Sequence, residues 1–248
     1  MSVAFVVAAL IPLAVLALGV RREVTRRLTA QHERRVNALV DIVRQDLARE
    51  SASIAARLEI LETDLSTDDR FRLGAVRSDP GHRRYVLDWA ERAMEVAGLS
   101  MLRVYDDAAR VVSSGHFRNE FGRDDTRLLA RLAAAPGEEA LIDVRTPSGS
   151  FRALARAEST KVGGRAFIIV GGTRVDSSFF TRLGRDGEID VSLALGEAGV
   201  PATHAIARLP LMYVDDTAAE VATTHLTIAP RADELQMLRR DLDRWVGA

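Results

Sequence analysis

The chain has 248 residues, a formal net charge of −1 at pH 7 and no cysteine. This length allows one large domain or two small ones. Acidic and basic residues are interspersed, so the sequence gives no sign of a face that binds nucleic acid. The lack of cysteine excludes disulfides, thiol catalysis and cysteine metal ligands.

An apolar run of about 18 residues, at positions 3–20, carries no charged side chain. That length is near the lower limit for a helix that crosses a bilayer. Six arginines follow within about 15 residues, and we interpret them as a flank that contacts lipid headgroups. The sequence therefore predicts a transmembrane helix over residues 1–20, with the membrane as a partner.

Apolar residues then recur at steps of three and four, which is the spacing of a coiled-coil seam. The seam consists of Val36, Val40, Val43, Leu47, Ile54, Leu58, Leu61 and Leu65, with the polar Ser51 inside it. This pattern predicts an amphipathic stalk helix over residues 21–66, continuous with the membrane span, and a parallel homodimer through that helix. The polar break at Ser51 indicates a movable joint.

Helical periodicity is lost after Leu65, and a mixed pattern of helices and strands begins there. The expected helices cover residues 84–97, 124–135 and 176–183, and the expected strands cover 101–105, 110–114, 140–145, 151–158, 165–173 and 189–195. This order predicts an α+β domain over residues 67–198, an antiparallel sheet with helices on one face.

The last part of the chain has a weaker pattern. Residues 199–229 contain two candidate strands, 209–214 and 221–228, which we expect to pair and pack on the sheet domain. A C-terminal helix is expected over residues 230–248. Arginines crowd beside Trp245 near its end, a composition typical of a membrane interface, so this helix is expected to lead toward a second span.

The overall layout resembles the sensor region of a bacterial sensor histidine kinase with a PAS-like, Cache-type extracytoplasmic domain. The resemblance rests on the apolar span with Arg21 and Arg22, the stalk, the hairpin at 104–120, the strand end at 170–173 and the segment 238–245. It implies that the sheet domain lies outside the bacterial inner membrane, in the periplasm. It also implies a second span, a HAMP-like relay and a kinase core beyond residue 248.

Membrane orientation is a point of conflict. Arginines follow the expected span and none precede it, so the positive-inside rule places the domain in the cytoplasm. Long domains translocate with limited regard to flanking charge, and we adopt the orientation that the resemblance implies.

Motifs for catalysis are missing from the sequence. No two of the five histidines are four residues apart, and neither a phosphate-binding loop nor a Gly-x-Ser-x-Gly elbow occurs. We therefore expect no enzyme activity, cofactor or metal for this chain, while the full-length protein could still be a histidine kinase.

The polar run after the second strand of the hairpin is the candidate ligand-binding site. Its side chains could bind a small anionic or zwitterionic molecule, with Arg118 pairing a carboxylate. The candidate residues are Tyr105, Ser113, Ser114, His116, Arg118, Asn119, Arg152 and Arg156. A capped strand end beside a solvated sheet face is the alternative interpretation, and it carries more weight.

The sequence thus predicts a membrane-anchored signal-sensing module of a two-component sensor histidine kinase. It would transmit the binding of an unknown small molecule or partner through its membrane-connected helices. The alternative is a stand-alone membrane-tethered ligand-binding or scaffold protein without kinase output. An apolar span and kinase motifs beyond residue 248 would favour the first interpretation, and a stop codon there would favour the second.

Overall fold

The computed structural model describes the backbone of residues 2–135, 137–183, 189–194, 207–215 and 221–230. Side chains are described at residue 34 and, within those ranges, from residue 36 onward except at 194, 221, 222 and 230. The C-terminal helix predicted over 230–248 lies outside the described residues, apart from Pro230, which ends a strand.

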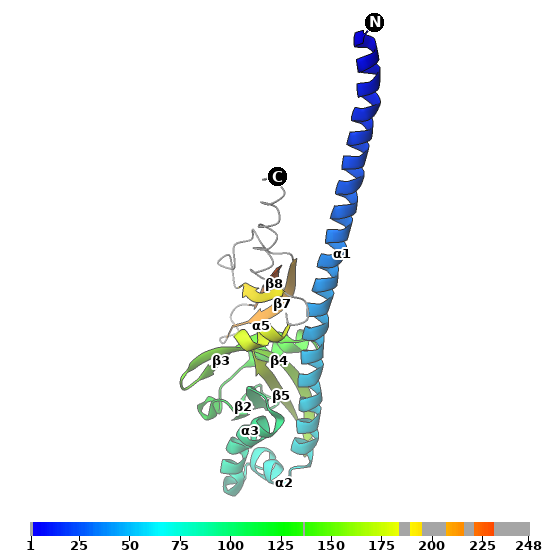
Figure 1. Ribbon diagram of the computed structural model, residues 1–248. Coiled ribbons are helices and arrows are strands. Elements are labelled where there is room, and N and C mark those ends of the chain that lie inside the picture. Colours follow the sequence, from blue (N-terminus) through cyan, green and yellow to red (C-terminus); the bar gives the residue numbers. More distant parts are fainter. Residues whose placement is uncertain (1, 136, 184–188, 195–206, 216–220, 231–248) are drawn as a thin grey trace.

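Helix α1 (Ser2–Thr67) is one uninterrupted helix of 66 residues, as the sequence predicts. Its N-terminal half extends well beyond the sheet domain, whereas its C-terminal half lies along the sheet (Figure 1). The helix ends where Asp68 caps the short helix α2 (Asp69–Phe71) by accepting a hydrogen bond from the Phe71 amide at 2.9 Å.

The predicted membrane span, residues 1–20, lies outside the residues whose side chains are described, so it stays a prediction. Within the described part of the chain, no helix is both long and apolar enough to cross a membrane.

Eight strands form one mixed sheet in the order β2-β1-β5-β4-β3-β7-β8-β6. The strands are β1 (Met101–Tyr105), β2 (Val111–Ser114), β3 (Ala140–Thr146), β4 (Gly149–Val162), β5 (Arg165–Arg174), β6 (Ile189–Ala194), β7 (Ala207–Val214) and β8 (Val221–Pro230). The fold class is α+β, as expected. The expectation of a purely antiparallel sheet is wrong, because β7 pairs in parallel with β3. This pairing extends the sheet from an edge of β3 that would otherwise stay open.

The remaining helices are short except for α3. They are α3 (Arg83–Ala97), α4 (Thr126–Ala134), α5 (Ser177–Leu183), the π-helical turn η1 (Arg72–Val76) and the 3-10 turns η2 (Pro80–His82) and η3 (Arg118–Glu120). Helix α3 ends at Gly98, whose positive φ of 63° suits a left-handed helix cap.

Two apolar cores lie on opposite faces of the sheet. The larger core lies beneath α1 and α3 and contains Leu102 and Val104 of β1. The smaller core lies beneath α4, whose Leu128, Leu129 and Leu132 pack on the other face. The expectation of helices on one face only is therefore wrong, since the loop between β2 and β3 folds α4 across the second face.

The apolar seam of α1 packs on the protein's own sheet. Seam residues from Val43 to Leu65 are at most 8% exposed and belong to the larger core. Helix–sheet packing and coiled-coil packing need the same three-and-four spacing, which explains why the seam alone predicted a partner helix. The stalk predicted over 21–66 is thus, in its second half, part of the sheet domain.

Candidate functional site

The hairpin of β1 and β2 places two polar side chains of β1 on the face covered by α4. Val104 pairs with Ser113 and Tyr105 pairs with Val111, so Val112 has no partner on β1 and forms a β-bulge. Arg103 lies opposite Ser114 and shares its face with Tyr105. Both side chains point toward the segment between β2 and α4.

A buried ion pair fixes this segment to β1. Arg103 is 1% exposed and donates from Nε to Glu120 Oε2 at 2.8 Å and from Nη2 to Glu120 Oε1 at 2.5 Å. Ser114 Oγ donates to the same carboxylate at 3.0 Å, and Arg123 Nη1 does so at 3.2 Å. The Glu120 carboxylate is thus saturated by groups of its own chain, which compensates the cost of burying it.

A second carboxylate continues the cluster toward α4. The Tyr105 hydroxyl donates to Asp125 Oδ2 at 3.0 Å, and Arg123 Nε lies 2.7 Å from Asp125 Oδ1. Asp125 immediately precedes α4, so this contact holds the start of the helix against the sheet. Arg103, Tyr105, Ser114, His116, Glu120, Arg123 and Asp125 together form what we name the ionic cluster.

His116 belongs to the ionic cluster, but neither of its ring nitrogens forms a well-aligned hydrogen bond to a described residue. Its side chain is 3% exposed, and Nε2 lies 3.2 Å from Glu120 Oε2. Burial lowers the pKa of His116, and Glu120 offsets part of that effect. The ring is therefore expected to be neutral at neutral pH.

The electrostatics favour a structural role over acid–base chemistry. Burial alone would raise the pKa of Glu120, but its contacts with His116 and Arg103 outweigh that effect and lower the pKa to about 2. Burial raises the pKa of Tyr105 well above its ordinary value. Glu120 therefore stays ionised and Tyr105 stays protonated near neutral pH, and their contacts order the segment between β2 and α4.

The structure brings together only three of the predicted site residues, Tyr105, Ser114 and His116. The neighbouring residues of the polar run point elsewhere. Ser113 Oγ accepts from the Ala90 amide at 3.0 Å and so tethers β2 to α3. Arg118 is half exposed and pairs with Asp88 of α3 at 2.7 Å, while Asn119 is exposed.

The two predicted arginines of β4 lie on the other face of the sheet, beneath α1. Arg156 donates from Nη1 to Ser51 Oγ at 3.0 Å, and Ser51 Oγ donates to Glu139 at 2.9 Å. Arg152 instead faces its cross-strand neighbour Asp143 of β3, with Nε 3.5 Å from Oδ1. Ser51 is 3% exposed and is hydrogen-bonded to Arg156 of β4 and to Glu139, the residue before β3, so it anchors the helix where the sequence suggested a loose joint.

Sequence reasoning missed four members of the ionic cluster: Arg103, Glu120, Arg123 and Asp125. One signal was present, because Arg103 lies inside the apolar strand Met101–Tyr105. An arginine in a strand buried on both faces needs a carboxylate partner. The sequence does not show which of many acidic residues that partner is. No group of three or more His, Asp or Glu residues that could hold a metal occurs in the described ranges.

Comparison with known proteins gave structural neighbours only. No family model matches the chain, and no curated protein does. Solved structures that resemble it include the periplasmic domain of Vibrio cholerae LuxQ, with a TM-score of 0.46, 10% identity and coverage of 78% of this chain and 99% of that one. The extracellular domain of the putative histidine kinase vpHK1S-Z8 has a TM-score of 0.48 and 9% identity, with coverage of 83% and 98%. The sensor domain of the V. cholerae histidine kinase DctB has a TM-score of 0.40 and 18% identity, with 66% of each chain covered. The chain thus resembles periplasmic or extracellular sensor domains of histidine kinases.

Proposed function

We propose that this chain is the extracytoplasmic sensing module of a membrane-anchored receptor whose output is a histidine kinase. One observation carries the proposal: α1 is a single helix that forms part of the core of the sheet domain and also extends far beyond it (Figure 1). The apolar run at positions 3–20 lies at the outer end of the same helix. A change in the sheet domain therefore has a direct mechanical connection to the predicted membrane segment.

The packing of α1 supports this coupling. Ile54, Leu58 and Leu65 are fully buried against the sheet, and each such side chain contributes roughly 1.5–3 kcal/mol. Ser51 is hydrogen-bonded to Arg156 of β4 and to Glu139, which precedes β3. These two bonds fix the position of the helix along the sheet. A tightly packed interface switches between discrete arrangements, so a rearranged sheet would shift the whole helix.

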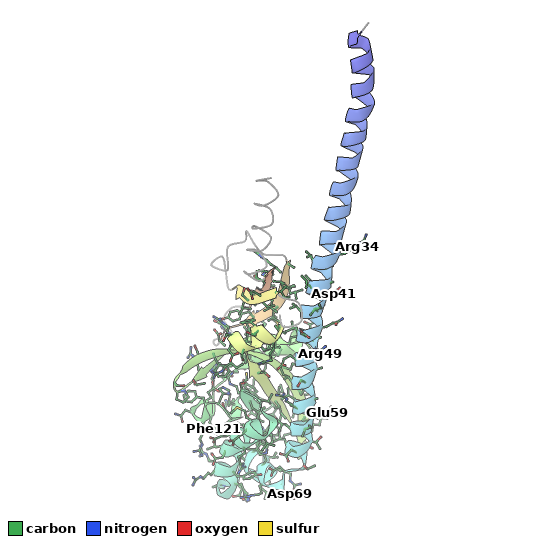
Figure 2. All side chains as sticks on the ribbon, viewed as in Figure 1. Arg34, Asp41, Arg49, Glu59, Asp69 and Phe121 are labelled. Atoms are coloured by element: carbon green, nitrogen blue, oxygen red, sulfur yellow. The ribbon has the colours of Figure 1, made fainter. Side chains whose placement is uncertain are left out.

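The opposite side of α1 is mostly polar, apart from the exposed Ile60. Arg34, Asp41, Arg49 and Glu59 are exposed and lie along the helix (Figure 2). A signal can act through this helix only if it binds two helix arrangements with unequal affinity.

The lack of cysteine offers a direct test of anchoring and sidedness. Lys161→Cys places one thiol on an exposed position of β4, and Ser2→Cys places one before the apolar run. In intact spheroplasts, a membrane-impermeant maleimide should label the Lys161→Cys chain and should label the Ser2→Cys chain only after lysis. Labelling of the Ser2→Cys chain before lysis, with protection of the Lys161→Cys chain until lysis, would place the domain in the cytoplasm, as the arginine count predicts.

A deletion of residues 3–20 complements the labelling. The full chain should float with lipid in a density gradient, and the deleted chain should stay in the soluble fraction. Equal flotation of both chains would contradict the predicted span.

A further inference from the structure

A cavity of about 300 Å³ lies at the end of the domain formed by η1, η2 and the start of α3. Its lining residues are Gly74, Ala75, Ser78, Asp79, Pro80, Arg83, Val86, Val112 and Phe121. Six of these nine residues are apolar or glycine. At about 30 Å³ per water-sized group, the volume suits a ligand of about ten non-hydrogen atoms.

Phe121 forms part of the cavity wall and is 43% exposed, although large apolar side chains are usually covered. It lies on the side of the domain away from α1 (Figure 2). The Arg83 guanidinium lies over its ring, with Cζ 5.4 Å from the centroid. A cation over an aromatic face, beside an apolar cavity, leaves the guanidinium edge free to bind an anion.

Arg83 is the available charged group of this cavity. Within the described part of the chain it forms no ion pair, unlike its neighbour Arg84, which faces Asp88 at 3.7 Å. The carboxylate of Asp79 is already engaged, because its two oxygens accept from the Gly81 amide at 2.9 Å and contact His82 Nδ1 at 3.0 Å. A ligand carboxylate therefore has one unpaired partner, the Arg83 guanidinium.

Three local departures from regular backbone meet at this cavity. Segment η1 is a π-helical turn, Ser78 has a positive φ of 56°, and Val112 is the unpaired residue of the β-bulge. A π-helical turn, a left-handed non-glycine residue and a bulge each occur preferentially at functional sites. Their convergence on one cavity is an observation independent of its lining chemistry.

We propose that this cavity binds a small monocarboxylate with an apolar body, held by Arg83 and covered by Phe121. The proposal deepens the proposed function by naming a site and a ligand class for the sensing module. Phe121 directly follows Glu120, so an occupant that moves the phenyl ring would pull on the ionic cluster. The site is distinct from the polar run at 113–119.

The test is a calorimetric titration of the purified full chain in detergent, with phenylacetate as the probe and phenylacetamide and phenethylamine as matched controls. Phenylacetate should bind saturably and the neutral amide should bind at least tenfold more weakly. Arg83→Gln should weaken phenylacetate binding about ten- to hundredfold, because a charge-assisted hydrogen bond is lost. The neighbouring exposed variant Arg84→Gln should bind like the wild type.

A second variant tests the cavity apart from the charge. Val112→Phe adds a ring to the lining and should abolish binding while the chain stays folded. The proposal is overturned if phenylacetate, benzoate and 3-methylbutanoate all fail to saturate at about 10 mM. It is also overturned if Arg83→Gln binds like the wild type, or if phenethylamine binds and phenylacetate does not. Binding is measured here without a membrane or an output, so its failure leaves the labelling and flotation results unaffected.

Discussion

On one face of strand β1, Leu102 and Val104 are buried among apolar side chains beneath α1 and α3. On the other face of the same strand, Arg103 is buried in the ionic cluster beside Tyr105. All four side chains are at most 1% exposed, so the two faces differ in chemistry and not in burial.

This difference separates stability from specificity. Apolar burial is non-directional and tolerates any neighbour of suitable volume. Buried ions tolerate only one arrangement, since each lone pair and each N–H needs a partner. The apolar face therefore holds α1 and α3 on the sheet, and the ionic face determines how the segment from Gly115 to Asp125 folds over it.

Breaking the buried pair should have the largest effect. Arg103→Met leaves the Glu120 carboxylate buried with fewer partners and should lower the free energy of unfolding by about 3–5 kcal/mol. The double variant Arg103→Met/Glu120→Leu should recover much of that loss, because no uncompensated charge remains. Urea denaturation of the single and double variants measures both effects.

The exposed pair of Arg165 and Asp107 is a matched control, since it has the same two-bond geometry. Arg165→Met should have a far smaller effect than Arg103→Met, because solvent screens the exposed pair. If Arg165→Met and Arg103→Met lower the free energy of unfolding equally, burial is not what makes the Arg103 pair important for stability.

Removing apolar contacts from the other face should cost somewhat less. Leu58 is fully buried and lies near Gly171, so Leu58→Ala should lower the free energy of unfolding by about 2–4 kcal/mol. Ile60 is 70% exposed on the same helix, and Ile60→Ala should be nearly neutral. The Leu58→Ala loss should not depend on protein concentration. An unfolding midpoint that rises with concentration would instead support the predicted dimer seam.

These two faces also mark the limit of what the sequence can predict. The boundaries of β1, the end of α3 at Ala97 and the continuous helix α1 follow from local patterns, and the structure agrees with them. The seam around Leu58 predicted burial correctly but not its partner, since periodicity is the same against a sheet or another helix.

The ionic cluster depends on distant pairings that no local pattern encodes. Arg103 and Glu120 are 17 residues apart. Their contact requires the bulge at Val112 and the fold of the intervening loop. The predicted site residues diverged for the same reason: alternation along a strand gives a face, but not what covers it. Arg156 and His116 thus have different partners on opposite faces.

Lowering the pH should destabilise the ionic face first. Burial holds the pKa of His116 below its ordinary value of 6.5, so the unfolded chain takes up a proton that the folded chain resists. The free energy of unfolding should therefore fall as the pH drops below about 6.5. Glu120, with a pKa of about 2, adds stability above its ordinary 4.5 that is lost as the pH falls toward 2.

Urea titrations between pH 7.5 and pH 5 separate the two groups, since Glu120 stays ionised throughout that range. The wild type should lose roughly 1 kcal/mol or less over this range. His116→Gln should be insensitive to that histidine's protonation and show a shallower slope. An unchanged slope in the variant would assign the pH dependence to another group.

The smallest expected effect concerns the turn that sets the register of both faces. Ala109 has a positive φ of 59°, a conformation that costs a residue with a side chain about 1 kcal/mol relative to glycine. Asp106 holds this turn by accepting from the Ala108 and Arg110 amides at 3.0 and 2.9 Å. Ala109→Gly should therefore raise the free energy of unfolding by about 0.5 kcal/mol, after the added backbone entropy of glycine in the unfolded chain is subtracted. Ala108→Gly, in the same exposed turn without a positive φ, gains only that entropy and should lower it. A gain for both variants would mean that relief of strain at Ala109 does not account for the gain, because Ala108 has no positive φ.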